Sequence, residues 1–83
     1  MDVVAVWTGQ HACWLWTAYR MSADAFAQEI LGVTPRTVLK WKAKPGMVPS
    51  HELQRALDTA LEQAPAGVRA RFALLDNQPV QRP

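Results

Sequence analysis

The chain has 83 residues, of which 49% are hydrophobic and 19% are charged. This length fits one domain and excludes a two-domain enzyme, and the composition excludes an intrinsically disordered chain. No apolar run approaches the roughly 20 residues that span a bilayer, and the single cysteine, Cys13, cannot form an internal disulfide. We therefore expect one small folded domain that is cytoplasmic and not associated with a membrane.

Positive charge is concentrated in one segment of the chain. The whole chain has nine Lys and Arg residues and seven Asp and Glu residues, which gives a net charge of +2. Residues 31–51 contain no acid, and the cations of this segment are Arg36, Lys40, Lys42 and Lys44. Such a patch on a near-neutral domain is typical of phosphate binding, because binding releases counterions. A solvated helix face is the alternative interpretation.

The N-terminal part of the chain is expected to contain an arm and one helix. Residues 1–7 are apolar and rich in valine, which predicts a short extended arm. Thr8 is a candidate N-cap, and apolar residues recur at helical spacing over residues 9–20. The apolar stripe of this first helix consists of Ala12, Leu15, Trp16 and Tyr19.

Two helices separated by a turn are expected in the middle of the chain. The first of them is expected over residues 23–30, with Ser22 as its N-cap. Thr34 is a candidate N-cap for the next helix, which is expected over residues 35–44. Pro35 suits its first position, because Pro has a suitable φ and lacks a donor that would be unpaired there. The apolar face expected for residues 23–30 consists of Ala23, Phe26, Ala27 and Ile30.

The last part of the chain is expected to contain two helices and a tail. Ser50 is a candidate N-cap for a fourth helix, and Pro65 separates this helix from a fifth. Residues 77–83 have no periodic pattern and are expected to be a disordered tail. The apolar residues of these two helices are Leu53, Leu57, Ala60, Leu61, Ala64, Val68, Phe72 and Leu75. The predicted fold is all-α, a compact five-helix bundle over residues 8–76.

The third predicted helix has two different sides. Val38 and Trp41 fall on one side of its helical wheel and are expected in the core. Arg36, Lys40 and Ala43 fall around the opposite side, which is basic and free of acids. A short helix, a turn with glycine and a second helix with a basic front form the arrangement that places an α-helix in the major groove of DNA.

Several stretches of the chain also carry a family resemblance. In the middle of the chain these are Met21-Ser22, Phe26-Ala27, residues 31–34, residues 36–38 and Lys40-Trp41. This pattern resembles the helix-turn-helix of the Cro/C1-type repressors. More closely, residues 7–9, 53–54, 56–61 and 68–72 are similar to small actinobacterial transcriptional regulators of this type. The resemblance extends over residues 7–75 and implies a five-helix, dimeric domain that binds double-stranded DNA through a helix-turn-helix.

The resemblance also implies roles for single residues. Arg36 and Lys40 would read bases, whereas Thr34, Lys42 and Lys44 would contact phosphates. Including a further phosphate contact from Arg20, the predicted DNA-binding residues are Arg20, Ser22, Thr34, Pro35, Arg36, Thr37, Lys40, Lys42 and Lys44. No cofactor is implied.

Two positions depart from the commoner pattern of this family. Pro35 stands where the family often has a polar side chain that reads a base. Ala27 lies five residues before Gly32, where the commoner pattern has four, so the second helix contains one extra residue. Gly32 itself permits the tight, left-handed turn that ends this helix.

Other chemistry has little support in the sequence. His11 and Cys13 supply too few ligands for zinc, and all glycines are isolated, which excludes a glycine-rich phosphate loop. Ser50 and His51 are adjacent, and adjacent residues do not face each other on a helix, so Ser50 is better explained as a cap. We therefore expect neither an enzyme nor a bound metal or cofactor.

The tryptophans leave two interpretations of the function open. Trp14 lies off the apolar stripe of the first helix and, with the valines of residues 1–7, would form an exposed apolar patch unless the arm folds over it. Such a patch suits a homodimer interface, for which the fifth helix is the alternative, or the docking site of a partner protein. The chain is then either a homodimeric DNA-binding regulator, such as a repressor, or an antitoxin-like or adaptor module. The acid-free side of the third helix favours DNA.

Overall fold

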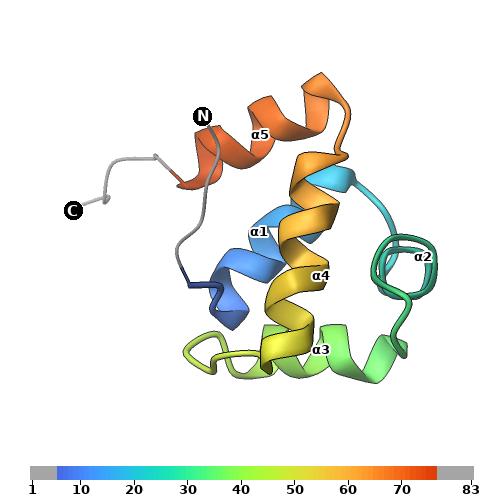
Figure 1. The fold of residues 1–83 in the computed structure, drawn as a ribbon, viewed down its shortest axis with the longest axis vertical. Coiled ribbons are helices and arrows are strands. Elements are labelled where there is room, and N and C mark those ends of the chain that lie inside the picture. Colours follow the sequence, from blue (N-terminus) through green and yellow to red (C-terminus); the bar gives the residue numbers. More distant parts are fainter. Residues whose placement is uncertain (1–5, 77–83) are drawn as a thin grey trace.

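The computed structural model describes residues 6–76, which fold into helices joined by short turns (Figure 1). The helices in chain order are α1 (Gly9–Tyr19), α2 (Ala23–Ala25), η1 (Phe26–Leu31), α3 (Pro35–Ala43), α4 (His51–Glu62) and α5 (Ala66–Asp76). Because α2 runs directly into η1, the described residues form five helical segments, and they contain no strand. The all-α fold class is confirmed. The predicted tail and most of the predicted arm lie outside the described residues.

Helix α1 lies at the centre of the arrangement. It packs against α3 on one side and against α5 on another, and α4 runs from the α3 end of the molecule to the α5 end (Figure 1). The radius of gyration is 12.0 Å, which agrees with the value of about 12 Å expected for a compact chain of this length. Within residues 6–76, no helix has the length and apolar character that crossing a bilayer requires.

The core consists largely of the apolar residues that the helical spacing predicts. The predicted positions that are buried are Ala12, Leu15, Phe26, Ala27, Val38, Trp41, Leu57, Ala60, Leu61, Ala64, Val68 and Phe72. Others are partly buried and pack against this core: Trp16, Tyr19, Ala23, Ile30 and Leu53. Each helix therefore turns the expected side inward.

Trp7 is a core residue, although its place in the sequence suggests the end of an extended arm. Its side chain is 1% exposed, and its ring lies 5.6 Å from that of Phe72. The backbone N–H of Trp7 donates to Gln54 Oε1 at 2.7 Å, and Gln54 Nε2 donates to the Trp7 carbonyl at 2.8 Å. The indole N–H donates to Asp58 Oδ1 at 2.8 Å. These bonds fasten the beginning of the described chain to α4.

Three of the four predicted N-caps make the expected hydrogen bond. The hydroxyls of Thr8, Ser22 and Ser50 each accept from the backbone N–H three residues later, at 3.1 to 3.4 Å. Thr34 occupies the N-cap position of α3, but its side chain makes no capping bond. Its Oγ1 lies 3.4 Å from Thr37 Oγ1 instead.

The second helical segment changes its winding after one turn. Residues 26–31 form a π-helix, in which each hydrogen-bonded turn holds one residue more than in an α-helix. Gly32 ends it with a φ of 71°, and its N–H donates to the Ala27 carbonyl. The π-helix thus accommodates the extra residue between Ala27 and Gly32 while Phe26 and Ala27 stay buried.

Gly9 permits a close approach between α1 and the loop that follows α3. A Cβ atom at Gly9 would lie 2.7 Å from the Lys44 carbonyl oxygen. The N–H of Gly9 donates to the Met47 carbonyl and that of Gln10 to the Pro45 carbonyl, both at 2.8 Å. The end of α3 is therefore fixed to the start of α1 by backbone bonds.

Candidate nucleic-acid interface

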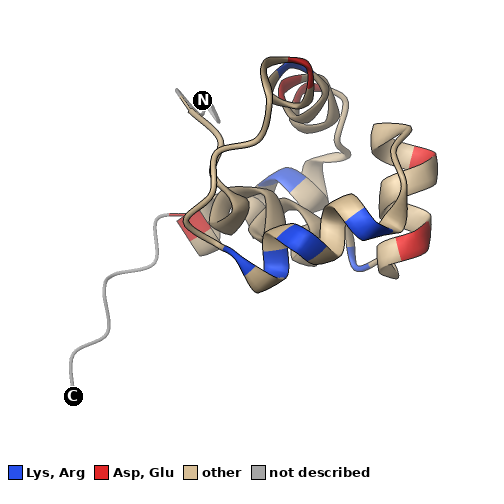
Figure 2. Ribbon diagram, turned by 90° about the horizontal axis from the view of Figure 1, so that it is seen from below, with Lys and Arg blue, Asp and Glu red and all other residues tan. Residues whose placement is uncertain are grey.

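Helix α3 has a buried side and a basic side. Val38 and Trp41 are 0% and 1% exposed, whereas Arg36 and Lys40 are exposed. The helix packs against α1 and η1. Figure 2 shows Lys and Arg positions following one another along this part of the molecule, without an acidic position between them. The opposition of core and basic sides predicted for α3 is confirmed.

Lys42 and Lys44 continue the positive charge to the end of α3. Both side chains are exposed, and Lys44 is the C-cap residue of the helix. Cations in the last turn also interact favourably with the helix dipole, so Lys40 and Lys42 have a local stabilising role in addition to any role in binding. We call the exposed set Arg36, Lys40, Lys42 and Lys44 the basic surface.

The N-terminal end of α3 adds two hydroxyl groups beside Arg36. Thr34 is exposed, and Pro35 and Thr37 are partly buried. Because the Thr34 hydroxyl does not cap the helix, it can donate a hydrogen bond outward. The N-terminal end of a helix carries a partial positive charge, so this is a favourable place for an anion. The predicted contacts Thr34, Pro35 and Thr37 are therefore grouped at one end of the basic surface.

Arg20 and Ser22 flank the turn between α1 and α2, and the structure places them differently. The side chain of Arg20 lines a surface hollow together with Lys42, which joins it to the basic surface. Arg20 ends α1 in the left-handed conformation, with φ of 58° and ψ of 40°, which residues other than glycine rarely adopt. Ser22 is exposed, but its hydroxyl already accepts a hydrogen bond from the Ala25 N–H.

The hollow between Arg20 and Lys42 also contains the single cysteine. Burial raises the pKa of the Cys13 thiol, and the positive charge of Lys42 opposes part of this increase. The thiol is therefore held in its neutral form rather than activated as a nucleophile. No acidic side chain lines this hollow.

Leu39 is an exposed part of α3 that the sequence pattern did not single out. Its side chain is 49% exposed, next to Lys40 in the chain. An apolar side chain at such a place on a helix in the major groove can contact the methyl group of thymine. The exposure of Leu39 could have been predicted from the helical wheel, because an angle of about 100° from Val38 places Leu39 at the edge of the buried side.

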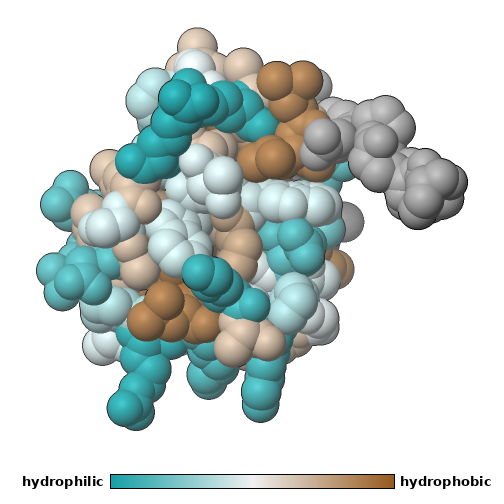
Figure 3. Space-filling view, turned by 180° about the vertical axis from the view of Figure 1, so that it is seen from behind, coloured by the Kyte–Doolittle hydropathy of each residue, from teal (hydrophilic) through white to brown (hydrophobic). Residues whose placement is uncertain are grey.

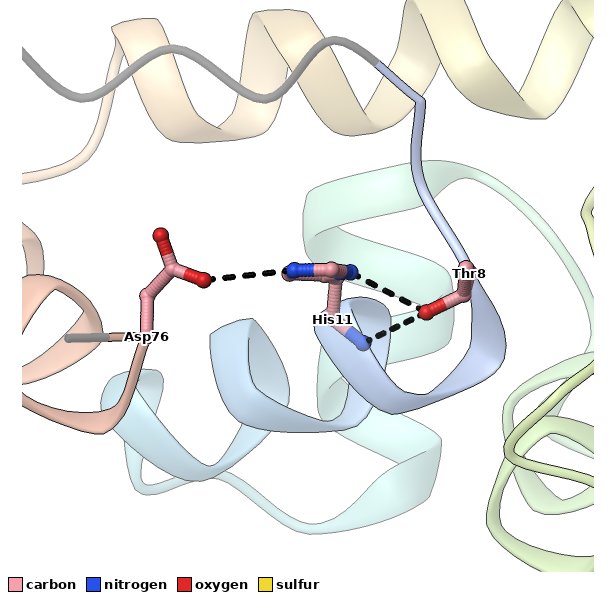
Figure 4. A network of polar contacts seen from close by, with 3 residues as sticks. All are labelled: Thr8, His11 and Asp76. Carbon is pink, nitrogen blue, oxygen red and sulfur yellow. Dashed lines mark hydrogen bonds and ion pairs between the residues drawn. The ribbon is translucent and has the colours of Figure 1, made fainter. Parts of the chain in front are cut away.

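The two histidines do not form a metal site. No group of three or more His, Cys, Asp or Glu residues gathers anywhere in residues 6–76. His11 instead lies between two elements, with Nε2 at 3.2 Å from Asp76 Oδ1 and Nδ1 at 3.0 Å from Thr8 Oγ1 (Figure 4). Thr8 Oγ1 also accepts from the backbone N–H of His11 and so caps α1. The network therefore fastens the start of α1 to the end of α5.

Trp14 is less exposed than the expected apolar patch would require, and the valines of residues 3 and 4 that would complete this patch lie outside the described residues. Trp14 is partly buried, packs against the core, and meets the ring of His11 edge-on at 5.1 Å. The large apolar side chains exposed within residues 6–76 are Val6, Leu39, Val48 and Leu74. Leu74 is the most exposed of them, at 72%.

The candidate interface thus combines the basic surface on α3, hydroxyl groups at the N-terminal end of that helix, and Arg20 at the end of α1. Arg20 shares a surface hollow with Lys42. The exposed cations of this interface come from α3 and from Arg20, and its backbone is held by buried side chains and by the bonds at Gly9. Comparisons of this chain with protein-family models, with curated proteins and with solved structures find no match.

Proposed function

We propose that this protein is a sequence-specific transcriptional regulator that binds double-stranded DNA with α3 in the major groove. The observation that carries the proposal is the acid-free basic side of α3, directly opposite the buried side chains of Val38 and Trp41. In this proposal α2, η1 and α3 act as a helix-turn-helix of the Cro/C1 type, with Gly32 in the turn. An α-helix fits the width of the major groove, where base edges differ in their donors and acceptors.

Arg36 and Lys40 are the proposed base-reading residues. Both are exposed on α3, and they lie four positions apart, so they occupy the same face of the helix. The guanidinium of Arg36 can donate two bonds to O6 and N7 of guanine, and Leu39 can contact a thymine methyl. Pro35 has no N–H and no polar side chain, so it contributes shape rather than a hydrogen bond at its position.

The remaining residues of the interface are proposed phosphate contacts. Lys42, Lys44 and Arg20 supply charge, and the hydroxyl groups of Thr34 and Thr37 lie at the positive end of α3. Phosphate contacts orient a protein on the duplex and supply affinity without distinguishing sequences. Ser22 can join them as well, because its hydroxyl accepts from the Ala25 N–H and keeps its own O–H free to donate to a phosphate.

We propose that the regulator acts as a homodimer. Two copies on a near-palindromic site increase the affinity without any new contact to a base. With Trp14 partly buried, the exposed Leu74 makes α5 the better candidate for the interface. Sedimentation at micromolar concentration should show a dimer that Leu74→Glu converts to monomers.

A protein-interaction module is the second candidate function. One observation favours it: Val6 and Val48, both exposed, line the same hollow beside α4. Exposed apolar groups that cluster often mark the docking site of a partner. An antitoxin-like protein or an adaptor would bind its partner here, and this binding would depend little on salt because apolar burial is not weakened by salt.

Selection from random duplexes followed by a salt titration tests the proposed function. Enrichment of a palindrome is expected, with half-sites separated by about one helical turn. Between about 50 and 200 mM salt, three cations per subunit should give a slope of log K against log salt near −3 for a monomer, and near −5 for a dimer. Failure to bind any duplex at the lowest salt would contradict the proposal and favour the interaction module.

A further inference from the structure

Two hollows adjoin on the outer face of α1. The first lies between α1 and α3 and includes Arg20 and Lys42 in its lining. The second lies between α1 and α5 and includes Arg20, Arg71 and Leu74. Both are lined by Thr17 and Arg20, so together they form one continuous surface from α3 to α5. We call this surface the α1 track.

The α1 track carries positive charge along its whole length. Its three cations, Lys42, Arg20 and Arg71, come from α3, from the end of α1 and from α5, and no acidic side chain lines either hollow. Within residues 6–76, none of these three cations forms an ion pair. Three like charges on one surface repel each other, so their arrangement is unfavourable until an anion lies among them.

One of these cations is held in place by the backbone of α1. Arg71 Nε donates to the Ala18 carbonyl at 2.9 Å, which fixes the guanidinium against the last turn of α1. Arg20 lies one residue beyond that helix, in a left-handed conformation that glycine would adopt at less cost. Arg71 is thus a positioned charge at the α5 end of the track, whereas Arg20 and Lys42 are exposed.

We propose that the DNA backbone lies along the α1 track, from Lys42 across Arg20 to Arg71, and that Arg71 is a further phosphate contact. The inference rests on the DNA binding proposed above and extends the same interface to α5. Lys42 is part of α3 and lines the α1 track, so positive charge extends along the track from α3 to α5. Figure 2 shows Lys and Arg positions both on α3 and beyond it, and Figure 3 shows that apolar areas lie next to hydrophilic side chains on the face opposite to that of Figure 1.

In the dimer proposed above, the second copy would cover the apolar flank of the α1 track, and the DNA backbone would contact only the cations of the track. An acidic segment of a partner protein is the alternative occupant of the track. Leu74 and Leu75 line the α5 end of the surface. The continuity of charge with α3 favours DNA, because a segment that needed only the apolar flank would have no use for the cations at the other end. A test must therefore measure the contribution of the charges to DNA binding itself.

The first experiment removes and restores the charge at Arg71. Binding of a fluorescent random-sequence duplex of about 30 base pairs is titrated between about 50 and 200 mM salt, because each phosphate contact adds about 0.9 to the magnitude of the slope. Arg71→Gln should reduce that magnitude by about 0.9 per bound subunit, whereas Arg71→Lys should retain it. Arg55→Gln, which removes the same charge from exposed α4, is the matched control and should retain the slope. A wild-type slope for Arg71→Gln would overturn the inference.

The second experiment leaves every hydrogen bond of Arg71 intact. Thr17 is exposed and lines both hollows, so Thr17→Glu places a carboxylate in the middle of the α1 track. It should weaken duplex binding about tenfold near 0.1 M salt. Thr59→Glu, an equally exposed substitution in the last turn of α4, should change it less than about twofold. Unchanged binding by Thr17→Glu would contradict the α1 track alone, whereas absence of wild-type binding at low salt would contradict the proposed function.

Discussion

Helix α1 is joined to α3 and to α5 in two different ways. Its first N–H groups donate directly to carbonyls of the loop after α3, where Gly9 leaves no room for a side chain. At α5 the connections run through side chains, from His11 to Asp76 and from Arg71 to the Ala18 carbonyl. The side chains of His11 and Asp76 are 29% and 33% exposed, so water competes for their contact. Both junctions also contain buried apolar side chains, so the difference lies in their polar connections: backbone bonds resist displacement, whereas contacts of partly exposed side chains are weaker.

This difference suits a division of tasks between the two ends of the molecule. The base reading proposed for the basic surface would need a fixed orientation, because it depends on donors held at defined positions. This surface is carried by the end that backbone bonds hold. The α5 end, where Leu74 is exposed, is the end at which we propose a second copy to bind.

The largest expected effect concerns the buried ring beneath the basic surface. Trp41 is 1% exposed, and Trp41→Ala should lower the free energy of unfolding by about 3–5 kcal/mol, because it leaves a large cavity. In a domain of this size that loss is enough to unfold the protein. Chemical denaturation followed by circular dichroism measures it. A cooperatively folded Trp41→Ala protein with near wild-type stability would show that α3 is not anchored through this ring.

The junction between α1 and α3 should be sensitive to a single added methyl group. Gly9→Ala brings a Cβ against the Lys44 carbonyl and should cost about 1–3 kcal/mol, because the backbone must shift. Gly46→Ala is the control, since a Cβ there meets no atom within 4 Å, and it should change the stability by less than about 0.5 kcal/mol. Thermal unfolding of both variants makes the comparison. Equal stabilities would mean that the junction adjusts freely.

The basic surface should contribute to sequence discrimination without contributing to folding. Arg36→Ala and Lys40→Ala should each lower the preference for the best duplex over a scrambled duplex by about 1–3 kcal/mol. Both side chains are exposed, so the unfolding midpoint should stay close to that of the wild type. Affinities for the two duplexes at one salt concentration test this. Equal losses on both duplexes would make these residues phosphate contacts instead.

The end of α1 should show a conflict between stability and binding. Arg20→Gly should raise the free energy of unfolding by about 0.5–1 kcal/mol, because glycine adopts the left-handed conformation without steric cost. The same substitution removes a proposed phosphate contact, so the affinity for duplex should fall. Unfolding curves and duplex titrations are measured on the same preparation. A variant that gains no stability would show that the Arg20 conformation is not strained.

The smallest effect is expected at the junction with α5. Asp76→Asn removes the charge that faces His11 and should cost about 0.5 kcal/mol, since both partners are partly exposed. Where His11 is protonated, the difference from the wild type should decrease as salt is added, because exposed charges are screened. Unfolding at low and high salt measures it. A loss comparable to that of Gly9→Ala would show that the two junctions are equally firm.

Sequence reasoning predicted the parts of this fold that depend on neighbouring residues. Helix limits agree with the structure to within about one or two residues. The caps at Thr8, Ser22 and Ser50, the stop at Gly32 and the sides of α3 all follow from local spacing. These signals are local because a cap or a helical stripe is defined within a few residues.

The parts that were missed depend on residues far apart in the chain. Trp7 is buried because Gln54 and Asp58, on a later helix, supply partners for its N–H groups. The contact of His11 with Asp76 likewise joins the two ends of the described chain. No pattern in one segment encodes such a pairing. For the same reason the α1 track could not be anticipated, because it depends on Arg71 lying beside the last turn of α1.

The pairing of Trp7 with α4 has a consequence for the order in which the chain folds during synthesis. Trp7 leaves the ribosome early, but Gln54, Asp58 and Phe72 emerge only with the last two helices. The core around this ring therefore cannot close until the chain has been made as far as Phe72. Each helix can form quickly from neighbouring residues. The contacts of Trp7 join residues about 50 positions or more apart in the chain, and contacts of such long sequence separation slow folding.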